Sequence, residues 1–148
     1  MAEPGKIRIL SVDDHPLMHE GIAAVIRNQP DMVLVAEAID GHQGIQLFRE
    51  HTPDVTLLDL RLPDMSGIET LVAIRSKFPA ARVIILTTFA EDVEISRAFE
   101  AGAHAYLLKS TPPKEIVDVI RQVHEGKRKL PAEIASNLAE HFSDGKAD

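Results

Sequence analysis

The chain has 148 residues, of which 45% are hydrophobic, and its formal net charge at pH 7 is −7. This apolar content suffices for the core of one domain, while 16 basic residues against 23 acidic ones exclude a basic surface for direct DNA binding. The chain has no cysteine, no apolar run long enough to span a membrane and no N-terminal signal peptide, so we predict a cytoplasmic protein without disulfides or cysteine-bound zinc.

Short apolar runs alternate with amphipathic segments along most of the chain. The expected strands, in chain order, are residues 6–12, 32–38, 54–59, 82–86 and 105–108. The expected helices that follow them run from Pro16 to before Pro30, from Asp40 to before Pro53, over 67–77, over 91–101, and from Pro112 to Gly126.

Two of these helices carry clear signals at their starts. Ser66 and Glu69 form a predicted capping box for the helix over 67–77. We expect its inward face to consist of Ile68, Leu71 and Val72. Thr111 is the expected cap of the last helix, with Pro112 as its first residue. The apolar stripe of that helix has helical spacing and comprises Ile116, Val119, Ile120 and Val123.

The alternation of strands and helices predicts an α/β fold. Near-continuously apolar strands are typical of a parallel sheet that helices cover on both faces. Right-handed crossover connections leave few topologies, and we predict a doubly wound, flavodoxin-like (βα)5 sheet of order 2-1-3-4-5. In that order the carboxyl ends of four strands meet at one rim of the sheet.

Polar residues follow the strands at that rim. They are Asp13 and Asp14 after the first strand, Asp59 after the third, Thr87 after the fourth and Lys109 after the fifth. Three carboxylates in one pocket repel one another unless a cation lies among them, and oxygen ligands suit Mg²⁺, or Mn²⁺ in its place. Carboxylate, cation, ammonium and hydroxyl together indicate phosphoryl transfer, with Asp59 as nucleophile. The chain has no phosphate-binding glycine loop, so the donor must come from another molecule.

These motifs resemble the receiver domain of two-component response regulators. The resemblance covers about residues 6–126, and it is carried by residues 12–14, 57–67, 86–87 and 106–109. Asp13-Asp14-His15-Pro16, residues 102–109 and the stretch after Gly126 are similar to the NarL/FixJ branch, in which a linker helix and a LuxR-type helix-turn-helix follow the receiver.

The resemblance implies a role for each rim residue. Asp59 would accept a phosphoryl group from a sensor histidine kinase. Asp14, Asp59 and the backbone carbonyl of Arg61 would bind Mg²⁺ directly, and Asp13 would bind it through water. Lys109 would pair with Asp59 and then with the phosphate.

The resemblance also implies how the signal leaves the site. Thr87 would turn toward the phosphate, Tyr106 would follow it inward, and Thr88 would shape access. The family often has proline where this chain has Ser110, so we leave open the isomer of the Lys109–Ser110 bond. Phosphorylation would promote a homodimer, and DNA would be bound only through an output domain absent from this chain.

We therefore divide the chain into a receiver domain, 1–126, and a segment of linker, 127–148. In the linker, Lys127 to Lys129 form a basic turn that we expect to be solvated, and a short helix carries Ile134, Leu138 and Phe142 before a frayed end. His15, His42, His104 and His124 are interpreted as structural or surface residues.

Three other functions were weighed against the receiver. A haloacid-dehalogenase-like phosphatase needs a second aspartate where Arg61 stands, and it needs length for a cap domain. A flavin- or nucleotide-binding module needs a phosphate-binding loop after the first strand. Asp13 and Asp14 stand at that place and would repel the ligand. A receiver-like module that acts by binding alone, without phosphorylation, stays open as the alternative.

Overall fold

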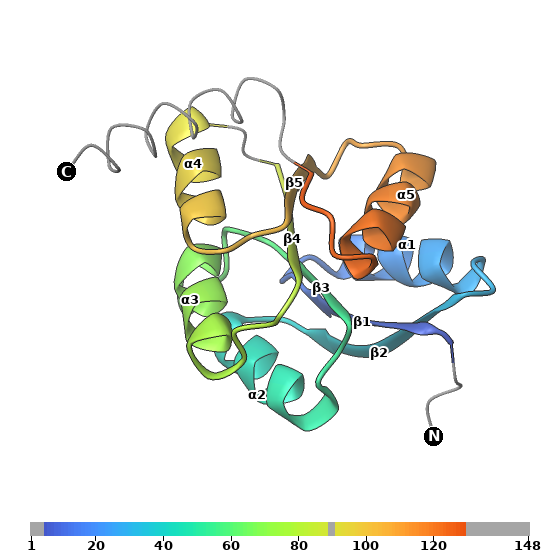
Figure 1. Cartoon of the computed structure of the whole chain (residues 1–148), viewed down its shortest axis with the longest axis horizontal. Helices are drawn as coiled ribbons and strands as arrows, with labels where there is room; N and C mark the ends of the chain where they lie inside the picture. The colour runs from blue at the N-terminus through green and yellow to red at the C-terminus, as the bar shows by residue number, and fades with distance from the viewer. Residues whose placement is uncertain (1–4, 89–90, 130–148) are drawn as a thin grey trace.

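The computed structural model describes residues 5–88 and 91–129 and contains alternating strands and helices (Figure 1). The strands are β1 (Ile7–Val12), β2 (Met32–Ala38), β3 (Val55–Leu58), β4 (Val83–Thr87) and β5 (Ala105–Leu108). The helices are α1 (Pro16–Arg27), α2 (Gly41–His51), α3 (Gly67–Lys77), α4 (Asp92–Glu100) and α5 (Pro113–His124). Within the described ranges, no helix is long and apolar enough to cross a membrane.

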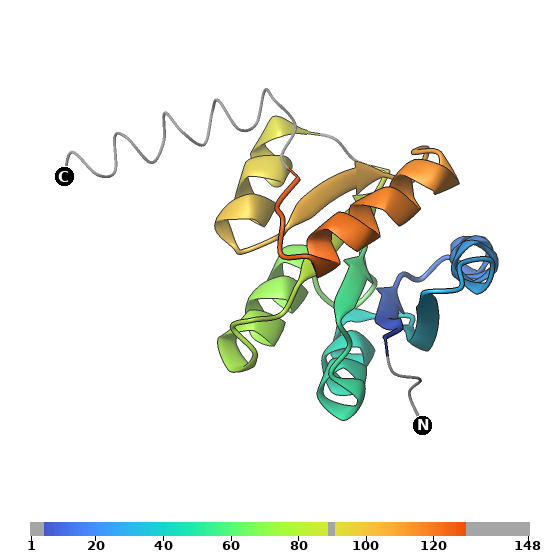
Figure 2. The same ribbon diagram turned by 45° about the vertical axis from the view of Figure 1, so that its right-hand side comes forward.

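The five strands form a parallel sheet of order β2-β1-β3-β4-β5, which confirms the predicted topology. Helices α1 and α5 cover one face, and α2, α3 and α4 cover the other (Figures 1 and 2). Ile9, Leu57 and Ile84 pack toward α1 and α5. The next residues along the same strands, Leu10, Leu58 and Ile85, pack toward the other three helices.

Strand register aligns the rim at which the polar residues lie. Val12 of β1 pairs with Leu58 of β3, so Asp13 and Asp59, the next residues, leave the sheet side by side. On β4, Thr87 pairs with Leu108 of β5, and Lys109 follows directly. The sequence positions at the strand ends are therefore brought to one rim by pairing alone.

Helix α3 begins as predicted, but its buried face is rotated. Ser66 accepts a hydrogen bond from the backbone N–H of Glu69 at 3.1 Å, as expected of the capping residue. Val72, predicted to face inward, is 52% exposed and that prediction is wrong. Thr70 and Ile74 are buried instead, and the Thr70 hydroxyl donates to the Ser66 carbonyl at 3.0 Å, which satisfies its polar group inside the core.

Helix α5 begins one residue later than predicted. Pro112 is its N-cap with φ −56° and ψ 141°, and Pro113 is its first residue, so the prediction of a Thr111 cap is wrong. A residue before proline is driven out of the helical region, and here that residue is Pro112. The predicted stripe of this helix is buried throughout. The described residues contain no cis peptide bond, so Lys109–Ser110 is trans.

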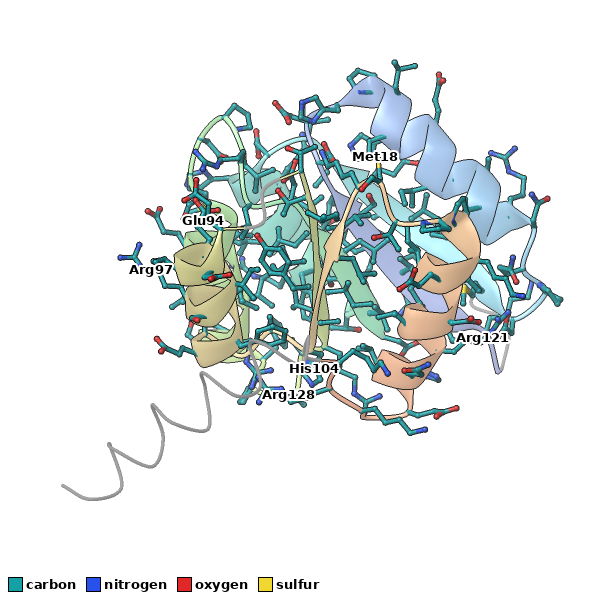
Figure 3. The ribbon with its side chains drawn as sticks, turned by 90° about the horizontal axis from the view of Figure 1, so that it is seen from above. Met18, Glu94, Arg97, His104, Arg121 and Arg128 are labelled. Carbon is teal, nitrogen blue, oxygen red and sulfur yellow. The ribbon has the colours of Figure 1, made fainter. Side chains whose placement is uncertain are left out.

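The start of the linker is exposed, as expected of a solvated run, but it is also hydrogen-bonded to the domain. The guanidinium of Arg128 donates to the carbonyls of Phe99, at 3.1 Å, and Ala103, at 2.8 Å, and lies 6.0 Å from the Phe99 ring centre. The Lys129 N–H donates to the His104 carbonyl at 2.7 Å. Arg128 and His104 lie together at the end of the sheet away from Met18 (Figure 3). Phe99 lies in the last turn of α4, where carbonyls lack partners within the helix, and Arg128 supplies a donor there. The predicted helix with Ile134, Leu138 and Phe142 lies outside the described residues.

Candidate active site

Two buried carboxylates and one ammonium form the centre of the rim. Asp13 is 4% exposed and Asp59 is 3% exposed. The Nζ of Lys109 lies 2.8 Å from a carboxylate oxygen of each. Buried carboxylates this close are tolerable only beside positive charge, so the three residues form one electrostatic unit.

Lys109 is held in its charged form by this arrangement. Burial alone lowers the pKa of the Lys109 ammonium, but its bonds to Asp13 and Asp59 outweigh burial and raise that pKa above its usual value. At neutral pH the site therefore contains a fixed positive charge next to Asp59.

A set of ligands suited to a divalent cation surrounds the same point. Among the described residues, Asp13, Asp14, His15 and Asp59 each offer one ligand atom, all within 4.8 Å of one another. Asp14 is exposed, which leaves room for water. Clustered carboxylate oxygens open to water fit Mg²⁺, and the residues present therefore match the predicted cation.

The two threonines at the end of β4, Thr87 as its last residue and Thr88 directly after it, occupy different surroundings. Thr87 is fully buried, and its hydroxyl makes no hydrogen bond within the part of the chain that the structure describes. An unused buried hydroxyl is costly unless a ligand uses it. Thr88 is exposed and lines a pocket of about 340 Å³ together with Asp14, His15, Asp59, Arg61, Leu62 and Pro63. The pocket gives a reacting group access to Asp59.

Arg61 and Tyr106 connect the site to α4. The Arg61 N–H donates to Asp59 Oδ1 at 3.3 Å, and its guanidinium donates to Glu94 of α4 at 2.9 Å. Glu94 and Arg97 project from α4 (Figure 3), and both line a second pocket together with Arg61. Tyr106 is 7% exposed in the core beside α4, and this burial raises the pKa of its phenol.

Two histidines belong to the site that sequence reasoning did not place there. His19 is buried, and its Nε2 contacts the Asp13 carbonyl. His15, interpreted from the sequence as structural or surface, is exposed but lies among the carboxylates, 2.8 Å from Asp13. The spacing of His19 with the buried Ile22 and Ile26, three and seven residues later, was a usable signal that it faces inward.

Asp64 ties the loop after β3 to helix α2. Its carboxylate accepts hydrogen bonds from the backbone N–H groups of Gly41, at 2.7 Å, and His42, at 2.9 Å, and contacts the His42 ring. Partial burial by itself raises the pKa of Asp64, but these bonds outweigh it and hold the pKa well below the usual range. A Cβ on Gly41 would lie 2.3 Å from the Met65 side chain and 2.6 Å from the Thr70 hydroxyl, so a larger residue here requires these side chains to shift. The loop that contains Arg61 is thus held in place by the hydrogen bonds between Asp64 and helix α2.

Replacing Asp64 with alanine is expected to lower the free energy of unfolding by about 1–2 kcal/mol at pH 7, because two N–H groups at the start of α2 lose their partner. Since the folded pKa is depressed, this stabilisation is complete above the unfolded pKa, about 4, and is lost as pH falls through the folded value. Urea denaturation of the native chain and of Asp64→Ala should show a smaller difference in unfolding free energy near pH 3 than at pH 7. Glu20→Ala, on an exposed face of α1, is the control, and an equal effect there would contradict the assignment.

Comparison with known proteins gives consistent matches. Residues 9–121 match the response regulator receiver domain family. The chain is 39% identical over 132 residues to the transcriptional regulatory protein LiaR of Bacillus subtilis (strain 168), and the match covers 89% of this chain and 63% of that protein. The chain therefore spans less than two thirds of the length of this relative.

Solved structures agree with the sequence match. A two-component response regulator of the LuxR family from Aurantimonas sp. SI85-9A1 aligns with a TM-score of 0.83 and 40% identity, over 93% of this chain and 99% of that one. The signal receiver domain of the putative response regulator NarL from Mycobacterium tuberculosis aligns with a TM-score of 0.80 and 35% identity, over 84% of this chain and 100% of that one.

Proposed function

The chain belongs to the response regulator receiver domain family, and from this premise we propose that Asp59 accepts a phosphoryl group from a sensor histidine kinase. Receiver domains of response regulators are signalling switches that act in transcription regulation in the LuxR-type relatives. The observation that carries the proposal is the position of Lys109, whose ammonium lies 2.8 Å from both Asp13 and Asp59, the latter a residue that lines a pocket.

In the proposed reaction a carboxylate oxygen of Asp59 attacks the phosphorus of the donor. An O–P bond forms, the N–P bond to the donor histidine breaks, and the leaving imidazole keeps the electron pair and takes a proton from water. Lys109 moves its hydrogen bond from the carboxylate to a phosphoryl oxygen. The Thr87 hydroxyl, which has no partner among the described residues, donates to another.

The carboxylates would also hold the cation of the site. Asp14, Asp59 and the backbone carbonyl of Arg61 would bind Mg²⁺, or Mn²⁺ in its place, directly, with Asp13 acting through water. When bound, the ion neutralises charge on the phosphoryl oxygens. The fit of the side chains supports this, since ligand atoms of Asp13, Asp14 and Asp59 lie within 4.8 Å of one another.

The proposed output follows from the neighbours of the site. Movement of Thr87 toward the phosphate would let the Tyr106 side chain follow it inward, and this would change the face formed by α4, β5 and α5. Arg61 already contacts Glu94 of α4 on that face. Thr88, on the pocket wall, would control access. The change would favour a homodimer and act on a DNA-binding domain beyond residues 127–148, which we assign to the linker. This role implies a cytoplasmic location.

The test is the intact mass of the protein after incubation with acetyl phosphate, with and without Mg²⁺. We expect one phosphoryl group to be added to the native chain only with Mg²⁺, and none to Asp59→Asn. Asp54→Asn, at the opposite end of β3, is the matched control and should be modified like the native chain. Mg²⁺ binding without any adduct would instead favour a receiver-like module that acts by binding alone.

A further inference from the structure

His15 directs a ring nitrogen into the carboxylate cluster. Its Nδ1 lies 2.8 Å from Asp13 Oδ1, 3.2 Å from Asp14 Oδ1 and 3.9 Å from Asp59 Oδ2. The same nitrogen lies 3.2 Å from the Nζ of Lys109. One imidazole nitrogen thus faces three carboxylates and an ammonium.

In either tautomer this nitrogen has one hydrogen-bond partner and also faces a group of the wrong polarity. If Nδ1 carries a proton, it donates to Asp13 but faces the ammonium of Lys109, which is also a donor. If Nδ1 has no proton, it accepts from Lys109 but directs its lone pair at carboxylate oxygens. A cation among the imidazole and the three carboxylates removes the mismatch with the carboxylates, because the nitrogen lone pair and the carboxylate oxygens then all face positive charge, while Lys109 keeps its bonds to Asp13 and Asp59.

The local sequence holds the ring in this place. His15 precedes Pro16, and the residue before a proline is biased to extended backbone; His15 has φ −97° and ψ 112°. Its backbone N–H donates to Asp13 Oδ1 at 2.9 Å, which turns the ring back over Asp13. One turn later His19 contacts the Asp13 carbonyl and fixes the other side of that residue.

We propose that His15 is a nitrogen ligand of the cation in this site, so that the site binds imidazole-preferring divalent ions such as Co²⁺ or Zn²⁺ more tightly than its carboxylates alone would. This inference rests on the proposed function, since the cation is the one that serves phosphoryl transfer. Carboxylates and water select Mg²⁺, whereas an imidazole adds affinity mainly for transition metals. His15 thereby determines which metals the receiver uses.

Calorimetric titration of the full chain with Co²⁺ and with Mg²⁺ tests the affinity. In His15→Ala we expect the Co²⁺ dissociation constant to rise about tenfold or more, and the Mg²⁺ constant to change less than about twofold. His42→Ala is the matched control, because His42 is also an exposed histidine beside an aspartate at the start of a helix, but it faces a single carboxylate. It should leave both constants unchanged.

Electron spin-echo spectroscopy of the native chain loaded with Mn²⁺ tests the bond itself. We expect modulation from a directly bound imidazole nitrogen, absent in His15→Ala and retained in His42→Ala. If Mg²⁺ and Mn²⁺ bind and Asp59 is phosphorylated, but no nitrogen signal is seen, His15 is not a ligand and the proposed function stands. If none of these ions binds and no adduct forms, both proposals fail.

Discussion

Replacing Gly67 with alanine is expected to destabilise the domain by about 3 kcal/mol, because the added methyl group meets main chain rather than a movable side chain. Gly67 is the buried first residue of α3. A Cβ there would lie 2.2 Å from the Asp59 carbonyl oxygen and 2.7 Å from the Leu60 Cα. The Gly67 N–H also donates to the Leu60 carbonyl at 2.8 Å, so α3 cannot simply move away without losing that bond.

The same substitution should damage the site, because the backbone that must move carries the proposed phosphoacceptor. A displacement of Asp59 by a fraction of an ångström to one ångström misaligns it with Lys109, and misplacement on this scale costs about a hundredfold in rate. We expect the initial rate of phosphorylation by acetyl phosphate to fall by about that factor at saturating Mg²⁺.

Gly21→Ala is the matched control, because Gly21 lies inside α1 and an added Cβ meets nothing within 4 Å. Alanine is a better helix former, so this variant should gain about 0.5–1 kcal/mol and keep its phosphorylation rate. Urea denaturation and the mass assay measure both quantities. Equal stability and rate in Gly67→Ala and the native chain would refute the close contact.

Replacing Lys109 with methionine is expected to cost about 3 kcal/mol of unfolding free energy in metal-free buffer at pH 7. The side chain is 11% exposed, and its loss leaves the buried carboxylates of Asp13 and Asp59 without their shared cation. Because the folded pKa of Lys109 is raised, its stabilisation is complete below the unfolded pKa, about 10, and is lost only as pH rises through the folded value.

Two further measurements separate the charge of Lys109 from its packing. Mg²⁺ should restore more stability to Lys109→Met than it adds to the native chain, since the ion becomes the main positive charge among the carboxylates. Phosphorylation should still fall about a hundredfold, because an ammonium no longer binds the phosphoryl oxygens. Lys114→Met, on exposed α5 surface, should change stability by less than about 0.5 kcal/mol. An equally small loss of stability in Lys109→Met would show that the ion pairs of Lys109 with Asp13 and Asp59 add no net stability.

The fold and the position of the central carboxylates follow from the amino-acid pattern. Short apolar runs such as 83–86, alternating with amphipathic segments, are typical of strands buried on both faces, and parallel strands joined by right-handed crossovers leave their carboxyl ends at one rim. Asp13, Asp59 and Lys109 follow such strands directly, so their meeting was predictable without coordinates. Proline and glycine likewise marked helix ends, as at Gly102 and Gly126, which both have positive φ.

Contacts between residues far apart in the chain could be seen only in the folded structure, because no sequence spacing predicts them. Thr70 replaces Val72 in the core because its hydroxyl can be satisfied by Ser66, and apolar patterning does not anticipate a buried polar residue. Arg128 binds the carbonyl of Phe99 in α4, 29 residues away, and that of Ala103 in the loop after α4, 25 residues away. The contacts of His15 depend on the orientation of its ring, and those of Asp64 depend on the path of the loop that carries it. The spacing of apolar residues predicts which face of a helix or strand is buried. The partners of charged side chains depend instead on which main-chain donors and acceptors, often far away in the sequence, remain unpaired in the fold.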